Sequence, residues 1–156
     1  MELSIRWLVP KDLVSAEDEG MIYAATDFDT FPADPGVYIF ARRYGDTIEP
    51  LYVGKAKNIK KRIAQQLNNV KLMKSVEIAK NGQRVVLIGV FEKKPNQDID
   101  KALKIIESAL IEHCLSWGYD ILNHQGTKRP VHNLQFSGNR DSTCLTGTVI
   151  KVPKRV

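Results

Sequence analysis

The sequence predicts a mixed α+β fold, and three kinds of pattern point to it. Residues 37–43 alternate between two faces in the period of a strand, and a second short strand is expected at 51–53. The apolar run 84–91 is rich in β-branched residues, which favours a central strand covered on both faces. Residues 98–117 repeat their apolar side chains at helical spacing. The 156 residues suffice for one domain with a single core.

The first two strands are expected to form a hairpin. Tyr38, Phe40 and Arg42 fall on one face of the first strand, because successive side chains alternate between faces. Residues 44–46 supply turn chemistry, and the second strand, which follows a proline, carries Tyr52. The two tyrosines therefore belong to neighbouring strands of one small sheet.

Two helices are expected between the hairpin and the central strand. Asn58 suits the N-cap of the first helix, in which Ile59, Ile63 and Leu67 recur every four residues along one buried stripe. The second helix is expected over 72–79, before the Asn-Gly pair that ends it. The basic side chains of the first helix lie off its buried stripe.

The longest helix is expected to begin at Asp98 or Asp100 and to place Glu107 at the edge of its apolar face. Glu112 belongs instead with the solvated side chains of that helix. A carboxylate at the border of an apolar face needs a partner, because an unpaired buried charge is costly. The partner of Glu107 is either a lysine or arginine from the body of the domain or a divalent cation.

The two ends of the chain show weaker patterns. Residues 5–9 form a short apolar stretch, and 21–25 suits either an edge strand or a short helix. Near the other end, 125–130 is typical of a loop, and 146–152 is expected to form one terminal strand.

Composition excludes several classes of protein. Hydrophobic residues make up 43% of the chain and charged residues 26%, as in ordinary globular proteins. No apolar run approaches the roughly 20 residues of a membrane helix, so no membrane partner is expected. The acidic beginning of the chain does not resemble a secretory signal. Cys114 and Cys144 stand far apart, so we expect free thiols and a cytoplasmic protein.

Charge is distributed unevenly along the chain. The formal net charge is +5, yet residues 1–35 carry two basic and eight acidic side chains. Residues 36–123 and 124–156 are both net basic. A basic surface favours a polyanionic partner, because each cation near a phosphate releases a condensed counterion.

Two short tripeptides, 36–38 and 52–54, are the first candidates for chemistry. They contain Tyr38 and Tyr52, each accompanied by a glycine, Gly36 or Gly54. Packing alone accounts for many tyrosines in strands. The glycines favour a functional role, because glycine permits the close approach of a backbone or a ligand.

A run of cations follows the second tyrosine directly. Such a run is usually a solvated helix face, but this one begins at the strand end that carries Tyr52. A phenol with a pKa near ~10 is a poor base unless cations or a metal stabilise its phenolate. A lysine among other cations can instead lose its own proton and act as the base. The run consists of Lys55, Lys57, Lys60, Lys61 and Arg62.

Other common site patterns are absent from the sequence. The histidines and cysteines have no zinc spacing, the glycines form no phosphate-binding loop, and no Gly-x-Ser-x-Gly elbow occurs.

The order of the candidate residues resembles the GIY-YIG nuclease family. The segment 51–62 and the preceding Pro-Gly-Val-Tyr are similar to the catalytic segment of bacterial excision-repair members of that family. Glu107 and the helix around it, with Asn123 beyond, resemble the family's glutamate helix and the asparagine that follows. The resemblance covers about residues 35–124.

This resemblance implies a small three-stranded antiparallel sheet flanked by helices and a divalent-metal-dependent endonuclease that cleaves DNA. Glu107 would hold a single Mg²⁺ (or Mn²⁺), and Arg62 would bind the scissile phosphate. Tyr38 and Tyr52, with Lys55 nearby, would position or deprotonate the attacking water. Asn123 would support the site; Gly36 and Gly54 would shape it. The expected DNA-binding cations are Lys57, Lys60, Lys61, Lys128 and Arg129.

The resemblance divides the chain into an N-terminal extension (1–34), a nuclease domain (35–124) and a basic C-terminal extension (125–156) that packs on the domain or trails it. The alternative is a non-catalytic nucleic-acid-binding module on the same fold. Roles in repair, restriction, mobile elements or phage biology remain open, as does a protein partner or homodimer.

Overall fold

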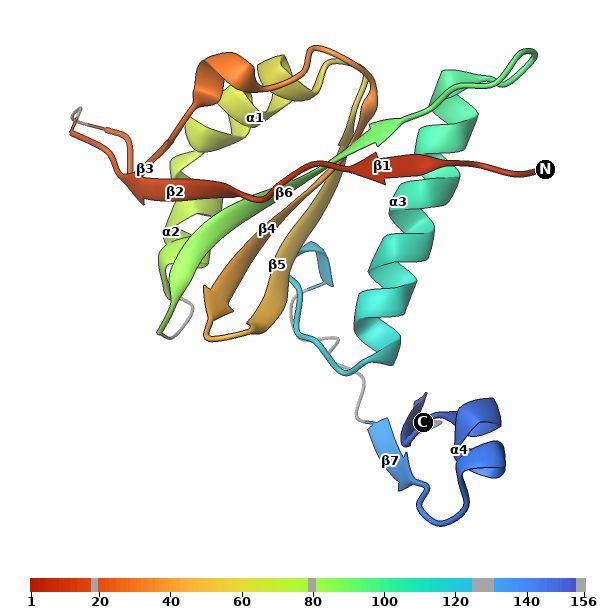
Figure 1. The fold of residues 1–156 in the computed structure, drawn as a ribbon. Helices are drawn as coiled ribbons and strands as arrows, with labels where there is room; N and C mark the ends of the chain where they lie inside the picture. The colour runs from red at the N-terminus through yellow and green to blue at the C-terminus, as the bar shows by residue number, and fades with distance from the viewer. Residues whose placement is uncertain (18–19, 79–80, 125–130, 154–156) are drawn as a thin grey trace.

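An antiparallel sheet of six strands forms the centre of the molecule (Figure 1). The computed structural model describes residues 1–17, 20–78, 81–124 and 131–153. The strand order is β3-β2-β6-β4-β5, and β1 pairs with β6 on the same side as β2. The strands are β1 (Ile5–Trp7), β2 (Lys11–Ser15), β3 (Tyr23–Ala25), β4 (Gly36–Tyr44), β5 (Thr47–Ala56) and β6 (Gln83–Phe91).

The three expected strands, now β4, β5 and β6, form the core of this sheet. β4 pairs with both β5 and β6, and β6 is covered on both sides as its apolar run predicted. The prediction of three strands is nevertheless too low, because the leader adds β1, β2 and β3. Without them, β6 would present an unpaired edge of backbone N–H and C=O groups. The segment 21–25, which suited a strand or a helix, supplies the strand β3.

β5 is longer than the sequence predicted, because a proline lies inside it. Phe40 of β4 faces Tyr52 of β5, but Ala41 faces Pro50, so Leu51 is an extra residue in a β-bulge. A proline is tolerated here, since β5 is an edge strand and bulges leave some backbone groups unpaired.

Helices cover both faces of the sheet. α1 (Ile59–Leu67) and α2 (Val70–Ile78) pack on the face that carries Tyr38 and Phe40. α3 (Ile99–Ser116) packs on the opposite face, against Ile39 and Ala41. The expected alternation along β4 is therefore confirmed. A short 3₁₀ turn, η1 (Phe28–Thr30), precedes the hairpin, and another, η2 (Leu122–His124), follows α3.

The helix starts agree with the capping signals in the sequence. The Asn58 side chain accepts a hydrogen bond from the Lys61 backbone N–H at 3.0 Å, which fixes the start of α1. The Asp98 side chain does the same for Lys101 at 2.9 Å, so Asp98 rather than Asp100 caps α3. Within the described residues, no helix is both long enough and apolar enough to cross a membrane.

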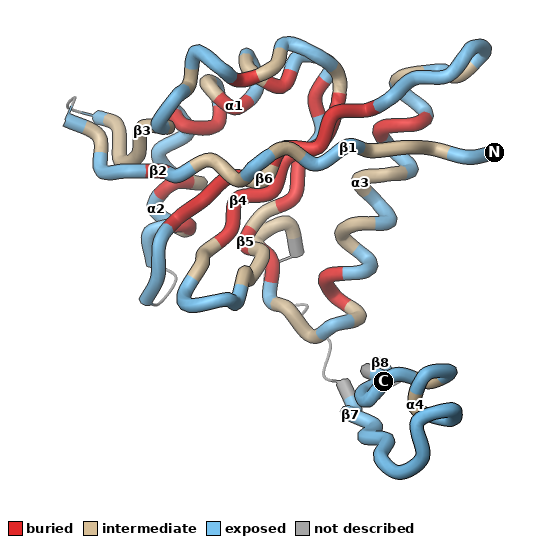
Figure 2. The backbone as a smooth tube through the Cα atoms, in the orientation of Figure 1, coloured by how far each residue is buried: buried red, intermediate tan, exposed pale blue. Residues whose placement is uncertain are grey.

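The C-terminal part forms a small hairpin-like unit. β7 (Val131–Gln135) pairs with β8 (Val149–Pro153), and α4 (Arg140–Thr146) connects them. The prediction of one strand over 146–152 is wrong at its start, because Asn139 caps a helix that runs to Thr146. The unit is mostly exposed, whereas the central strands β4 and β6 of the main sheet are mostly buried (Figure 2). The expected loop 125–130 lies outside the described residues.

Candidate active site

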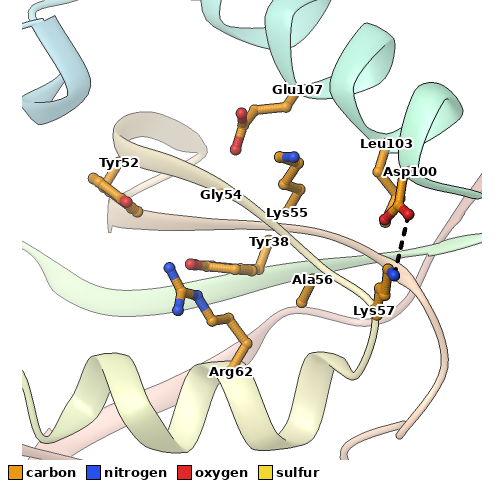
Figure 3. A pocket seen from close by; sticks show the side chains of 10 residues that line it. All are labelled: Tyr38, Tyr52, Gly54, Lys55, Ala56, Lys57, Arg62, Asp100, Leu103 and Glu107. Atoms are coloured by element: carbon orange, nitrogen blue, oxygen red, sulfur yellow. Dashed lines mark ion pairs between the residues drawn. The ribbon is translucent and has the colours of Figure 1, made fainter.

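A cleft of about 290 Å³ lies at the β5 edge of the sheet, between the start of α1 and the first half of α3 (Figure 3). The cleft is lined by residues of α1, from one face of the sheet, and of α3, from the other. Side chains from these two helices can meet there because β5 is the edge strand. The lining residues of the cleft are Tyr38, Tyr52, Gly54, Lys55, Ala56, Lys57, Arg62, Asp100, Leu103 and Glu107.

The two tyrosines lie diagonally across the hairpin. Tyr38 faces Gly54, and Tyr52 faces Phe40, so the tyrosines are on one face but not directly opposite each other. Their ring centroids are 6.4 Å apart. Both phenols therefore reach the same cleft from neighbouring strands.

The two glycines of the tripeptides make room for this arrangement. A methyl group on Gly54 would overlap the ring and hydroxyl of Tyr38. A methyl group on Gly36 would overlap the carbonyl oxygen of Gly89 and crowd Ile59. Neither glycine has the positive φ that an ordinary residue avoids, so both are needed for space rather than for backbone freedom.

Replacing Gly54 by alanine is expected to lower the free energy of unfolding by about 1–3 kcal/mol, because the added methyl must displace the Tyr38 ring. Urea denaturation measures this change. A Tyr38→Leu background provides the control, since it removes the ring that the methyl meets. An equal penalty for Gly54→Ala in both backgrounds would contradict the proposed overlap.

Tyr38 is the most enclosed functional side chain of the cleft. It is 1% exposed, and its hydroxyl accepts a hydrogen bond from the side-chain amide of Gln66 at 3.0 Å. Burial raises the pKa of Tyr38, and the smaller lowering effects of Gln66 and Arg62 do not cancel it. Among the protein's own cations, Arg62 lowers the pKa of Tyr38 by less than burial raises it.

Glu107 projects from α3 into the cleft, between Tyr52 and Lys55 (Figure 3). It is half-buried. Within the part of the chain that the structure describes, its carboxylate forms no ion pair and no hydrogen bond. The sequence left two possible partners for Glu107, a basic side chain or a divalent cation. No lysine or arginine pairs with it among the described residues.

The cations of the basic run differ in their surroundings. Lys55 and Arg62 line the cleft, and the Arg62 guanidinium lies beside the hydroxyl end of Tyr38 (Figure 3). Lys57 forms an ion pair with Asp100 at 3.1 Å, but both side chains are 69% exposed, so the pair contributes little stability.

Two further cations of the run lie outside the cleft. Lys61 borders an adjoining groove that Lys57 and Arg62 also line. Lys60 is directed away, toward the carbonyl oxygen of Asp29 at 3.4 Å and the ring of Phe28. Lys128 and Arg129, the remaining expected DNA-binding cations, lie outside the described residues.

Asn123 supports the site from behind the edge strand and does not line the cleft. Its side-chain oxygen accepts a hydrogen bond from the Val53 N–H at 2.9 Å. Its side-chain nitrogen donates to the Val53 carbonyl at 2.7 Å. The amide thus satisfies two backbone groups of the edge strand, between Tyr52 and Gly54, and holds that strand in place.

Comparison with known proteins agrees with this geometry. Residues 34–97 match the family model of the UvrC-like GIY-YIG domain. Residues 34–97 belong to a UvrC-like GIY-YIG domain. Neither the curated proteins nor the solved structures include a significant match to the chain. The matched range of the GIY-YIG domain ends before α3, so the folded structure is what brings Glu107 to the motif residues.

The donor set of the cleft suits a single divalent cation. In the described residues, no three acidic, histidine or cysteine side chains gather around one point. Asp100, the second acid of the cleft, is paired with Lys57, whereas Glu107 has no ion-pair partner in the described part of the chain. Mg²⁺ commonly binds one or two carboxylates and completes its shell with water and substrate phosphates. The unpaired Glu107 carboxylate fits that pattern.

Sequence reasoning missed Gln66 as a member of the site. Gln66 lies on the buried stripe of α1 with Ile59, Ile63 and Leu67, and it is only 6% exposed. A polar side chain on a buried stripe requires a hydrogen-bond partner. That signal was present in the sequence, but the identity of the partner depended on how α1 packs against β4.

Proposed function

We propose that the protein is a divalent-metal-dependent endonuclease that hydrolyses DNA phosphodiester bonds with one metal ion. One observation carries the proposal: the carboxylate of Glu107, which is unpaired within the described residues, enters the same cleft as two phenols, a lysine and an arginine. The lining residues between 38 and 62 lie within the range that matches the UvrC-like GIY-YIG domain. A protein that only binds nucleic acid has no need for an uncompensated negative charge facing the phosphates.

The reaction breaks one P–O bond with one water molecule. A water oxygen forms a bond to phosphorus, and the bond from phosphorus to one sugar oxygen breaks. One proton of the water passes to a general base, and the departing sugar oxygen takes up a proton. The products are a phosphomonoester end and a free hydroxyl.

Residues of this chain have distinct roles in that reaction. Glu107 would hold Mg²⁺ (or Mn²⁺), which when bound offsets negative charge on the phosphate as it is attacked. Arg62 would bind the scissile phosphate and stabilise the charge that develops on its oxygens. Tyr52 or Lys55 would take the proton of the water, since both are less enclosed than Tyr38, whose pKa is raised by burial.

The DNA backbone would continue from the cleft along the adjoining groove. Lys57, Lys61 and Arg62 border that groove and offer their charges to neighbouring phosphates. Lys60 is directed away from the groove, toward η1 (Phe28–Thr30), and would contact DNA only after leaving its present position. The DNA strand would thus contact the protein over several nucleotides, along the cleft and the adjoining groove.

The proposal is tested by nicking of supercoiled plasmid DNA. Cleavage is expected with Mg²⁺ or Mn²⁺, and EDTA is expected to abolish it. Binding of the plasmid without cleavage in either metal would favour the alternative, a non-catalytic nucleic-acid-binding module. A panel of duplex, single-stranded, branched and flapped substrates would then separate sequence-directed from structure-directed cutting.

A further inference from the structure

The hydrogen bond between Gln66 and Tyr38 carries an inference about the direction of the Tyr38 proton. The side-chain nitrogen of Gln66 lies 3.0 Å from the Tyr38 hydroxyl oxygen, and both side chains are buried. An amide nitrogen only donates, so the Tyr38 oxygen is the acceptor in this contact. The hydroxyl group of Tyr38 therefore does not donate its proton to Gln66.

A second donor approaches the same oxygen from the same helix. Arg62 stands one turn before Gln66 on α1, and its guanidinium lies beside the Tyr38 hydroxyl (Figure 3). A guanidinium has no acceptor, so it too can only donate to the phenol oxygen. Two donors on the α1 side leave the phenol O–H to point away from α1, and Tyr38 lines the cleft.

We propose that Gln66 is a positioning residue that holds Tyr38 as a hydrogen-bond donor facing the cleft, where it binds an anionic oxygen of the phosphodiester. This inference rests on the proposed nuclease function and adds a role to it. Tyr38 then stabilises charge on the phosphate and does not take the proton of the attacking water. The general base is left to Tyr52 or Lys55.

The packing of Gln66 agrees with a dedicated role. Apolar side chains surround it on the stripe of α1, where Ile59, Ile63 and Leu67 are buried. A leucine or methionine would fill this position without the cost of burying an amide. The amide is matched to one polar group of the core, the hydroxyl of Tyr38.

The pairing itself is tested without metal or DNA. In a ¹⁵N-labelled sample, the side-chain amide resonances of Gln66, assigned with Gln66→Met, are expected to shift in Tyr38→Phe. That substitution removes the acceptor oxygen and retains the ring. Unchanged Gln66 amide resonances in Tyr38→Phe would overturn the proposal, whether or not the protein proves to be a nuclease.

The role in the reaction is tested with single-turnover plasmid cleavage in Mg²⁺. Gln66→Met is expected to lower the maximal rate about tenfold, the loss of roughly one oriented hydrogen bond in the transition state. The protein concentration that gives half-maximal rate is expected to stay unchanged. In a Tyr38→Phe background, Gln66→Met is expected to have no further effect, because Gln66 acts through the hydroxyl.

Gln83→Met is the matched control. It removes another glutamine donor, which binds the Leu13 carbonyl at 2.8 Å far from the cleft, and it is expected to leave the rate unchanged. An equal loss for Gln66→Met with and without the Tyr38 hydroxyl would show a merely structural role and overturn the proposal. If wild-type protein fails to cleave in any metal, the nuclease proposal falls, and the amide resonances still decide the pairing.

Discussion

Replacing Glu107 by glutamine is expected to reduce plasmid cleavage by about a thousandfold, because the loss of a metal's charge stabilisation costs several kcal/mol in the transition state. Glutamine keeps the shape of the side chain and removes its charge. Manganese binding, followed by the electron paramagnetic resonance of Mn²⁺, is expected to weaken in parallel. These two measurements link the rate to the cation rather than to the geometry of the cleft.

The thermal stability of the same variant shows whether the loss of cleavage comes from a lost metal ligand or from a broken ion pair that supported the fold. Glu107 is half-buried and unpaired within the described residues, so removing its charge is expected to leave the Tm unchanged or raise it. Breaking a buried ion pair would instead lower the Tm strongly. Glu112→Gln, on an exposed part of α3, is the control and should cleave normally. Cleavage by Glu107→Gln within tenfold of wild type would contradict the assigned role.

Elements with strong local patterns could be predicted from the sequence. The alternation along β4, the apolar run of β6 and the stripe of α1 each encode one element and its buried face. Capping side chains fixed two helix starts, at Asn58 and Asp98. These signals are local, so they do not require knowledge of what the element packs against.

Elements that depend on a distant partner could not be predicted in the same way. β1, β2 and β3 are short, and they become strands because the open edge of β6 pairs with β1 and β2. β5 continues through Pro50 because a bulge at Leu51 accommodates the proline without ending the strand. In both cases the decisive interaction joins residues far apart in the sequence.

The candidate site shows the same division. The motif spacing indicated Tyr38, Tyr52 and Arg62, and the structure places them around one cleft with Glu107. The motif spacing gave no indication that Lys60 turns toward η1 (Phe28–Thr30), because that contact depends on where the segment before the hairpin folds back. The hydrogen bonds between the Asn123 side chain and the Val53 backbone could not be predicted either, since the two residues are 70 positions apart in the sequence.

Replacing Arg62 by alanine is expected to lower the cleavage rate by about 10²–10³-fold, the usual cost of removing one donor that stabilises transition-state charge. Arg62→Lys is expected to recover only part of this loss, because an ammonium cannot reproduce the planar, two-pronged contact of a guanidinium with phosphate. Single-turnover rates at saturating protein measure both variants. Lys74→Ala, on the exposed surface of α2, is the matched control.

Arg62 is proposed both to bind a phosphate through its charge and to stabilise the transition state through its guanidinium. The salt dependence of DNA binding separates these two functions. Arg62→Ala removes one phosphate contact, so the slope of log affinity against log salt is expected to fall by about one. Arg62→Lys retains the charge and is expected to retain the wild-type slope while the rate stays low. If lysine restored the rate and the slope together, Arg62 would act only by its charge. In that case stabilisation of the developing charge would pass to Glu107 and its cation, with Tyr38 as the remaining oriented donor.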